Sequence, residues 1–217
     1  MEEIKPIIAV LGGTGNEGPG LALRWADAGY KVIIGSRQLE KAQRIASEIN
    51  VKLNQSSVTG LLNKDASTKA DICVLTVVQT AHQTAIENLK DVLQGKILVD
   101  ATARVDFRDP KPPSAPSAAE IAQNILGSGV RVVAAFQNVP AHSLRSIEKK
   151  ISSEILVCSD DLDAAEEVIK LAKAAGMGAY YAGGLANAIT VEGITSLLIN
   201  INKHYKVKTS SIRISGI

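Results

Sequence analysis

Short apolar runs alternate with amphipathic segments along most of this chain. The apolar runs predict strands at residues 7–11, 31–35, 71–78, 96–100, 130–134, 154–158 and 178–181, with a weaker one near 57–59. Helical spacing predicts helices after residue 18 and at 39–49, 64–69, 80–89, 117–126, 161–175 and 185–204. Continuous apolar runs are typical of parallel strands buried on both faces. The alternation therefore predicts an α/β fold with a doubly wound, mostly parallel sheet and a small C-terminal helical extension.

The first predicted strand leads into a glycine-rich turn. The turn has the pattern G-x-G-x-x-G at Gly13, Gly15 and Gly18, and a helical pattern follows at once. In a dinucleotide fingerprint the first glycine permits the turn, the second admits a pyrophosphate, and the third lets the helix pack on the strand. The free N–H groups of the helix then face the phosphates. The order predicts a Rossmann-type domain whose cofactor contacts include Gly13, Thr14, Gly15, Asn16, Glu17 and Gly18.

The end of the second predicted strand indicates which dinucleotide is bound. NAD-selective proteins usually carry Asp or Glu there to bind the ribose 2′-hydroxyl. This chain instead has Ser36 and Arg37, with Lys41 one helical turn later. A hydroxyl, a planar guanidinium and an ammonium attract a 2′-phosphate, so we expect NADP(H) rather than NAD(H). Ser36 also fits the N-cap of the second helix.

Ligands of such sheets bind outside the carboxyl ends of the strands. We therefore expect further cofactor contacts where later strands end, and we expect strand six to end beside strand four. The candidates are Thr76, Val77, Val78, His82, Ala101, Gln137, Asn138, Val139 and Pro140. No histidine has a nearby Asp or Glu at a spacing that suggests a proton relay. We therefore predict no catalytic side chain and no metal ligand. The missing acid or base would fit a direct hydride exchange between two redox cofactors, which needs mainly proximity and stacking.

Residues 101–116 interrupt the strand–helix alternation. Four prolines predict a surface loop, and loops of this length are often lids or binding loops. Ser117 and Glu120 have the spacing of a capping box. We predict an NADP-binding domain at 1–145 and a smaller C-terminal region at 146–217 that packs on it and carries acceptor-site and dimer contacts.

Charge and composition limit the classes of binding partner that the chain can have. The 217 residues carry a net charge of +2 with no basic run, which argues against nucleic-acid binding. No apolar run is long enough for a membrane span, and the acidic start is unlike a secretory signal. Cys73 and Cys158 are far apart without metal-ligand spacing, so we expect buried thiols. We therefore expect a cytoplasmic protein that binds small molecules.

The chain resembles coenzyme F420-dependent NADP oxidoreductases along nearly its full length. The resemblance lies in residues 12–22, 35–37, 71–77, 117–120, 138–141, 185–187, Glu192 and 212–214. It implies hydride transfer between NADP(H) and the deazaflavin coenzyme F420. Thr14, Ser36, Arg37 and Lys41 would then hold the NADP phosphates, while residues 137–140 and the C-terminal tail would line the nicotinamide–deazaflavin stack.

Two positions depart from the family pattern, and they lie on the acceptor side. Residues 78–80 replace a frequent Pro and aromatic, and Gln137 replaces a frequent His. Alternative functions are NADPH-dependent reduction of a flavin, quinone or ferric acceptor, or NADPH sensing without catalysis. The family tends to form dimers, and Ile194, Leu197, Leu198 and Ile201 form an apolar face at helical spacing. This face predicts a homodimer, although it also fits packing within the subunit.

Overall fold

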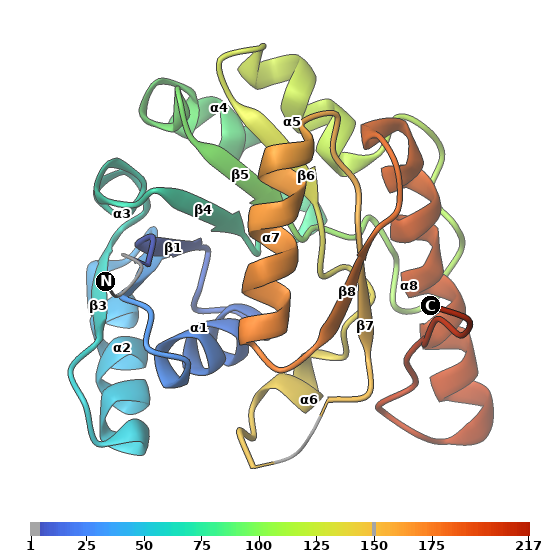
Figure 1. Ribbon diagram of the computed structural model, residues 1–217, viewed down its shortest axis with the longest axis horizontal. Helices are drawn as coiled ribbons and strands as arrows, with labels where there is room; N and C mark the ends of the chain where they lie inside the picture. The colour runs from blue at the N-terminus through green and yellow to red at the C-terminus, as the bar shows by residue number, and fades with distance from the viewer. Residues whose placement is uncertain (1–4, 149–150) are drawn as a thin grey trace.

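A six-stranded parallel sheet forms the centre of the computed structural model, which describes residues 5–148 and 151–217. The strands lie in the order β3-β2-β1-β4-β5-β6 (Figure 1). They comprise β1 (Ile8–Leu11), β2 (Val32–Ser36), β3 (Val58–Leu62), β4 (Ile72–Leu75), β5 (Ile97–Asp100) and β6 (Arg131–Ala134). The order reverses between β1 and β4, as in the doubly wound dinucleotide-binding fold. The predicted fold class is confirmed.

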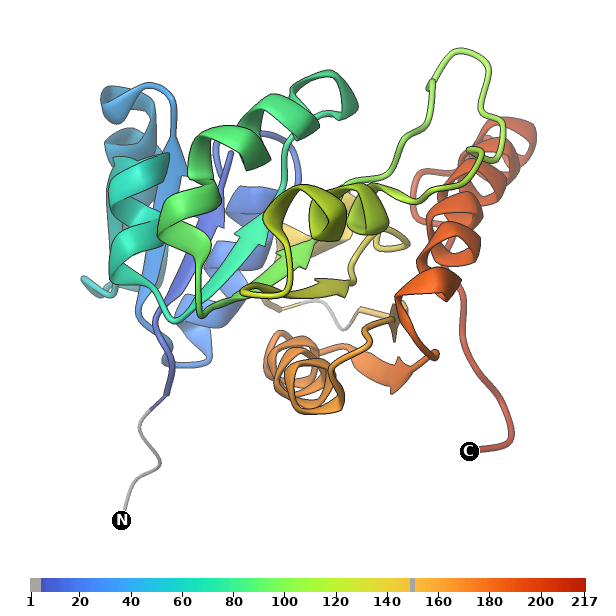
Figure 2. The same ribbon diagram turned by 90° about the horizontal axis from the view of Figure 1, so that it is seen from above.

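Helices cover both faces of the sheet. One face packs against α1 (Gly18–Asp27), α2 (Leu39–Leu53) and α7 (Leu162–Ala174). The other packs against α3 (Asn63–Lys69), α4 (His82–Leu93) and α5 (Ala118–Leu126). Figure 2 shows α7 on one side of the sheet and α4 and α5 on the other. Successive strand residues alternate between the two cores, which explains why the strands are apolar at nearly every position.

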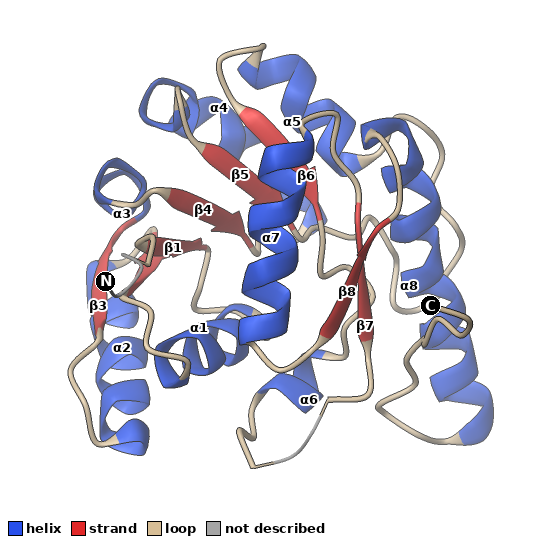
Figure 3. Cartoon of the chain, in the orientation of Figure 1, coloured by secondary structure: helices blue, strands red, loops and turns tan. Residues whose placement is uncertain are grey.

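The C-terminal part adds a second, smaller sheet. Strands β7 (Glu154–Val157) and β8 (Gly178–Tyr181) pair in parallel, and α7 connects them (Figure 3). An antiparallel bridge between Ala134 and Cys158 joins this pair to β6. The core beneath α7 is continuous with the core beneath α1, and Trp25 Nε1 donates to the Leu171 carbonyl at 2.9 Å. The short helix η2 (Leu185–Asn187) then leads into the long helix α8 (Ala188–Tyr205).

The proline-rich loop is fastened to α8 rather than left free. Buried Glu192 accepts hydrogen bonds from Arg104 N, Arg104 Nε and Ala118 N at 2.7, 2.8 and 3.0 Å. Asn200 Nδ2 donates to the Pro110 carbonyl farther along the helix. Figure 2 shows the loop beside α8. The predicted capping box of Ser117 and Glu120 is confirmed and starts α5.

Three sequence expectations need correction. β4 ends at Leu75 rather than residue 78, because its neighbour β1 ends at Leu11 and the bonds from Thr76 N and Oγ1 to the Leu11 carbonyl are the last between the two strands. The short helices η1 (Gln79–Ala81) and α6 (Ala141–Leu144) were not predicted. β6 lies beside β5 and not beside β4, so the expected contact between strands six and four is wrong.

Candidate functional site

The glycine-rich turn lies at the carboxyl end of β1, next to the point where the strand order reverses. Gly12 adopts a φ of 69°, and its N–H donates to Asn63 Oδ1 at 3.2 Å. Gly13 N donates to the Gly35 carbonyl of β2 at 2.9 Å. Asn63 was not predicted as part of the turn, because only the packing of α3 brings it there. These bonds tie the turn to β2 and α3.

The three glycines of the motif have different surroundings. A Cβ on Gly13 would lie 2.6 Å from the Val10 carbonyl oxygen, and one on Gly18 would lie 2.6 Å from the Gly13 Cα. A Cβ on Gly15 would meet nothing closer than 3.7 Å. The fold therefore requires glycine at 13 and 18 but leaves Gly15 open. Such an open cradle, beside a helix that no side chain of the described residues caps, fits a dinucleotide pyrophosphate.

Glu17 is an unusual residue at this position. It precedes α1, and its Oε1 is buried with no hydrogen-bond partner in the described part of the chain. Burial raises the pKa of the Glu17 carboxyl to about 8. The carboxyl is therefore mostly protonated at neutral pH and adds little negative charge to the turn.

The cationic group predicted at the end of β2 lies on the same edge of the sheet. Ser36 is buried, and its Oγ accepts a hydrogen bond from Gln38 N at 3.1 Å. Ser36 is not the N-cap of α2, because Gln38 occupies that position. Arg37 and Lys41 are exposed, and neither side chain has a partner among the described residues. Two unpaired cations beside a buried hydroxyl can receive a phosphate dianion.

The end of β4 contributes both polar and apolar groups. Thr76 is held on the Leu11 carbonyl, and Val77 lies against Gly12. Val78 is 70% exposed, which is unusual for a valine next to a buried strand. Ala101 N donates to the Leu75 carbonyl at 3.1 Å, so the ends of β4 and β5 stay together. These residues form the part of the edge between the glycine turn and β6.

A buried, hydrogen-bonded pair of side chains lies directly behind this edge. His82 Nε2 is 2.6 Å from Asp100 Oδ2, and both side chains are almost fully buried. Sequence spacing suggested no acidic partner for any histidine, and the structure nevertheless gives one to His82. Leu75 and Asp100 lie opposite each other in the β4–β5 register, so the residues just after β4 approach Asp100. The residues are eighteen positions apart, a spacing that no local motif covers; the strand-end rule could have found the pair.

Asp100 also connects this pair to the loop after β6. Its Oδ1 accepts from Thr102 N at 2.9 Å, and its carbonyl accepts from Gln137 Nε2 at 2.8 Å. Gln137 thereby reaches across from the end of β6 to β5. The sequence predicted direct contact between the ends of strands six and four. The structure instead connects the loop after β6 to the end of β5 through this hydrogen bond.

The loop after β6 is held in a strained backbone conformation. Phe136 has a φ of 76°, an outlier for a bulky side chain, and its ring packs edge to face on Trp25 at 5.8 Å. Thr195 Oγ1 of α8 donates to the Gln137 carbonyl at 2.7 Å, and Asn138 Nδ2 donates to the Glu154 carbonyl of β7 at 2.7 Å. Val139, which is buried in the core, and half-buried Pro140 follow. Contacts to three other elements fix this loop, and strain of this kind concentrates at functional sites.

Glu154 also brings the C-terminal tail near the loop. Its N–H donates to the Ile212 carbonyl at 3.1 Å, and its carboxylate accepts from Ile214 N. The same residue therefore holds both Asn138 and the tail. Gln137 Oε1, Asn138 Oδ1 and Thr102 Oγ1 are buried without partners in the described residues, so this corner retains unused hydrogen-bonding capacity.

The remaining reactive side chains lie elsewhere. Cys73 and Cys158 are buried free thiols, as predicted, and burial raises the pKa of each to about 11. His142 is exposed on α6 and His204 near the end of α8. No helix of the described residues is long and apolar enough to cross a membrane.

Comparisons with known proteins agree with this geometry. The family described as coenzyme F420-dependent NADP oxidoreductase matches residues 7–104. An F420-dependent NADP reductase of Methanothermobacter thermautotrophicus is 40% identical over 97% of this chain and 95% of its own. The chain belongs to the family of F420-dependent NADP reductases. A second reductase so named, from Methanocaldococcus jannaschii, is also 40% identical, over 97% of this chain and 98% of its own.

A solved structure supports the same assignment. A protein of Arthrobacter sp. FB24, proposed to be an F420-dependent NADP reductase, superposes with a TM-score of 0.81 and 25% identity. The alignment covers 98% of this chain and 100% of that one. The resemblance inferred from the motifs is thus confirmed over the whole reductase, including the C-terminal part that the matched residues 7–104 leave out.

Proposed function

We propose that this protein transfers a hydride directly between NADP(H) and coenzyme F420. The observation that carries the proposal is the placement of a dinucleotide turn and a strained, tightly held loop at one edge of a parallel sheet. NADPH gives up a hydride and becomes NADP⁺; oxidised F420 accepts that hydride together with a proton from solvent. The protein's part is to bind both cofactors, hold their rings together and exclude water.

The residues at the glycine turn would hold the NADP(H) phosphates. Gly13, Thr14, Gly15, Asn16, Glu17 and Gly18 surround the open cradle, while Ser36, Arg37 and Lys41 would receive the 2′-phosphate. We expect Arg37→Ala to weaken NADPH binding by roughly 10- to 150-fold, the equivalent of ~1.5–3 kcal/mol for a charge-assisted hydrogen bond. Titration of NADPH and NADH into both proteins measures this. Equal wild-type affinity for the two cofactors would reject the preference for NADP(H).

The later strand ends would line the nicotinamide and the acceptor. Exposed Val78 and half-buried Pro140 offer apolar surface, Val139 is buried in the core under the loop that it belongs to, and the fixed φ of Pro140 stiffens that loop. Thr76, Val77, Ala101, Gln137 and Asn138 would complete the wall, and His82 would support it from behind through Asp100. The C-terminal tail lies near enough to Asn138, through Glu154, to border the acceptor.

The wider organisation is also part of the proposal. Residues 1–145 form the NADP-binding domain, and residues 146–217 pack on it and add acceptor and dimer contacts. The homodimer would use the outer face of α8, where Leu197 and Ile201 are 55% and 42% exposed. Light scattering that reports a monomer at micromolar concentration would reject the dimer. The two buried free thiols support a reducing, cytoplasmic location.

Stopped-flow mixing tests the reaction itself. NADPH-loaded protein is mixed with oxidised F420, and NADPH absorbance and F420 fluorescence are followed together. We expect rapid NADPH oxidation with F420 and slow or no oxidation with FMN. Oxidation by FMN but not by F420 would overturn the assigned acceptor, while the fold and the NADP(H) site would stand.

A further inference from the structure

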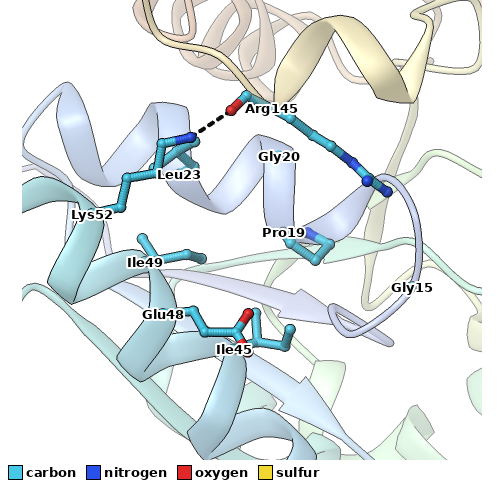
Figure 4. Close-up of a pocket in the computed structure, with 9 residues that line it drawn as sticks. All are labelled: Gly15, Pro19, Gly20, Leu23, Ile45, Glu48, Ile49, Lys52 and Arg145. Atoms are coloured by element: carbon cyan, nitrogen blue, oxygen red, sulfur yellow. Dashed lines mark hydrogen bonds between the residues drawn. The ribbon is translucent and has the colours of Figure 1, made fainter.

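A cavity of about 310 Å³ opens beside the glycine turn, between α1 and α2. Its floor is apolar, with Pro19, Leu23, Ile45 and Ile49, and Gly15 lies at one end (Figure 4). The charged residues at its border are Glu48, Lys52 and Arg145. In Figure 4 the Arg145 side chain extends from α6 toward the loop that carries Gly15.

The segment that carries Arg145 is held rigidly on α1. Leu144 is fully buried, and a Cβ on Gly20 would lie 2.5 Å from the Leu144 Cβ, so the two backbones approach closely. Buried Arg24 donates from Nε to the Leu144 carbonyl at 3.2 Å and from Nη2 to the Ser143 and Ser146 carbonyls. Most of the carbonyls around the end of α6 are thus satisfied by one side chain.

The backbone of Arg145 is itself fastened, whereas its guanidinium is not. Lys52 Nζ donates to the Arg145 carbonyl at 2.7 Å (Figure 4). The Arg145 side chain is exposed and has no hydrogen bond or ion pair within the described residues. The structure therefore positions an arginine closely without using its charge internally. An unpaired guanidinium carried on a fixed backbone is suited to bind an anion bidentately.

The surrounding charges favour an anion at this place. The first turn of α1 contains no acidic residue, and its uncapped N-terminus carries the positive end of the helix dipole. Glu48 borders the cavity, but its carboxylate lies 3.8 Å from Arg44 Nη1 and is partly neutralised. Glu17 is mostly protonated at neutral pH. Positive charge from Arg145 and from the helix end therefore predominates around Gly15.

We propose that Arg145 binds the pyrophosphate of NADP(H), while the cations at the end of β2 would bind the 2′-phosphate. This rests on the proposed NADP(H) function. Gly15 is the glycine of the motif that admits the pyrophosphate. Two cations share the cavity with it: the Lys52 ammonium is bonded to the Arg145 carbonyl, whereas the Arg145 guanidinium has no hydrogen bond or ion pair within the described residues. Arg145 would thus contribute affinity common to every dinucleotide, whereas Arg37 would contribute selectivity for NADP(H).

The test separates the two phosphate groups with two ligands. NADPH carries both the pyrophosphate and the 2′-phosphate, while adenosine 2′-monophosphate carries only the latter. Calorimetric titration of wild type, Arg145→Ala and Arg37→Ala measures each affinity. We expect Arg145→Ala to weaken NADPH about 10- to 100-fold and to leave adenosine 2′-monophosphate within about twofold. Arg37→Ala should weaken both ligands.

Controls make the result specific to this arginine. Arg131→Ala removes an exposed arginine at the opposite, amino-terminal end of β6 and should leave both affinities unchanged. Arg145→Lys keeps the charge but loses the planar fork, so its NADPH affinity should fall between wild type and Arg145→Ala. Thermal unfolding should be the same for wild type and Arg145→Ala, because the guanidinium has no internal contact in the described residues.

Three results would overturn the assignment. An unchanged NADPH affinity in Arg145→Ala would show that the guanidinium does not touch the cofactor. An equal loss of affinity for both ligands would show that Arg145 binds the 2′-phosphate and not the pyrophosphate. A wild-type protein that binds neither ligand would reject the NADP(H) function, and this assignment with it.

Discussion

The glycine turn after β1 and the loop after β6 lie on the same sheet edge but are specified in opposite ways. The need for glycine at positions 13 and 18 comes from neighbours in sequence, since a Cβ on either residue would clash with the backbone of residues 10–13. Bonds to Gly35 and Asn63 then hold the turn on β2 and α3. The loop owes its shape to distant residues: Trp25 packs on Phe136, Asp100 binds Gln137, and Thr195 binds the Gln137 carbonyl. A nucleotide-binding turn can thus be specified locally, whereas the proposed acceptor side depends on the whole fold.

The largest expected effect comes from removing His82, which pairs with Asp100 next to the loop after β6. His82→Ala leaves the Asp100 carboxylate buried without its partner, which typically costs ~3–5 kcal/mol of unfolding free energy. The rate of hydride transfer in the folded variant should fall less than about tenfold, because no proton donor is required. Chemical denaturation and stopped-flow kinetics measure the two quantities. His142→Ala, which removes an exposed histidine, is the control and should change neither. A loss of hydride transfer of 100-fold or more would make His82 catalytic.

The next largest effect should be the pH dependence of stability that Glu17 of the glycine turn introduces. The Glu17 carboxyl has a raised pKa of about 8 when folded and an ordinary pKa near 4.5 when unfolded. The folded state therefore retains a proton that the unfolded state loses, and stability falls as pH rises from about 4.5 to 8. Relative to Glu17→Gln, wild type should lose on the order of 2–4 kcal/mol between pH 5 and pH 9. Glu166→Gln, an exposed position on α7, should show no such divergence. Parallel stability curves for wild type and Glu17→Gln would show that the carboxyl is not buried as described.

Alanine at two glycines should separate folding from binding within the turn. A Cβ at Gly13 would lie 2.6 Å from the Val10 carbonyl oxygen, so Gly13→Ala should destabilise the protein by ~1–3 kcal/mol. Gly15→Ala meets no protein atom closer than 3.7 Å and should leave the melting temperature nearly unchanged. It should still weaken NADPH binding about tenfold or more, because the methyl group occupies the pyrophosphate cradle. Differential scanning fluorimetry with and without NADPH measures both effects. Unchanged NADPH affinity in Gly15→Ala would place the pyrophosphate elsewhere.

The smallest expected effect comes from the single hydrogen bond between Thr195 of α8 and the loop after β6. Thr195→Val removes the hydroxyl that donates to the Gln137 carbonyl, at a cost of ~1 kcal/mol. We expect a severalfold rise in KM for F420 and a smaller change in NADPH affinity, because the phosphates of NADPH would be held at the glycine turn and not by the β6 loop. Thr190→Val, at an exposed position of the same helix, is the matched control. If NADPH affinity falls together with F420 affinity, the two regions are not independent.

The homologous reductases and the observed sheet confirm what the glycine motif and the strand pattern predicted. The motif could be interpreted because its three glycines and the helix that follows are adjacent in sequence, although Gly35 and Asn63 also bind the folded turn. His82 and Asp100 could not be paired in this way, since strand adjacency and not sequence spacing brings them to 2.6 Å. The neighbour of β6 was wrongly predicted for the same reason: apolar runs show that strands are buried but not which strands are adjacent.

The sequence by itself determined the α/β alternation, the dinucleotide turn, the cations at the end of β2 and the capping box of α5. Each is set by covalent proximity, by backbone sterics or by helical and strand periodicity, all of which act over short stretches of chain. Only the tertiary structure decided the strand order, the His82–Asp100 pair, the strained conformation at Phe136 and the orientation of Arg145. These features depend on which distant residues share a core or a sheet edge, and that is fixed by the burial of the whole chain.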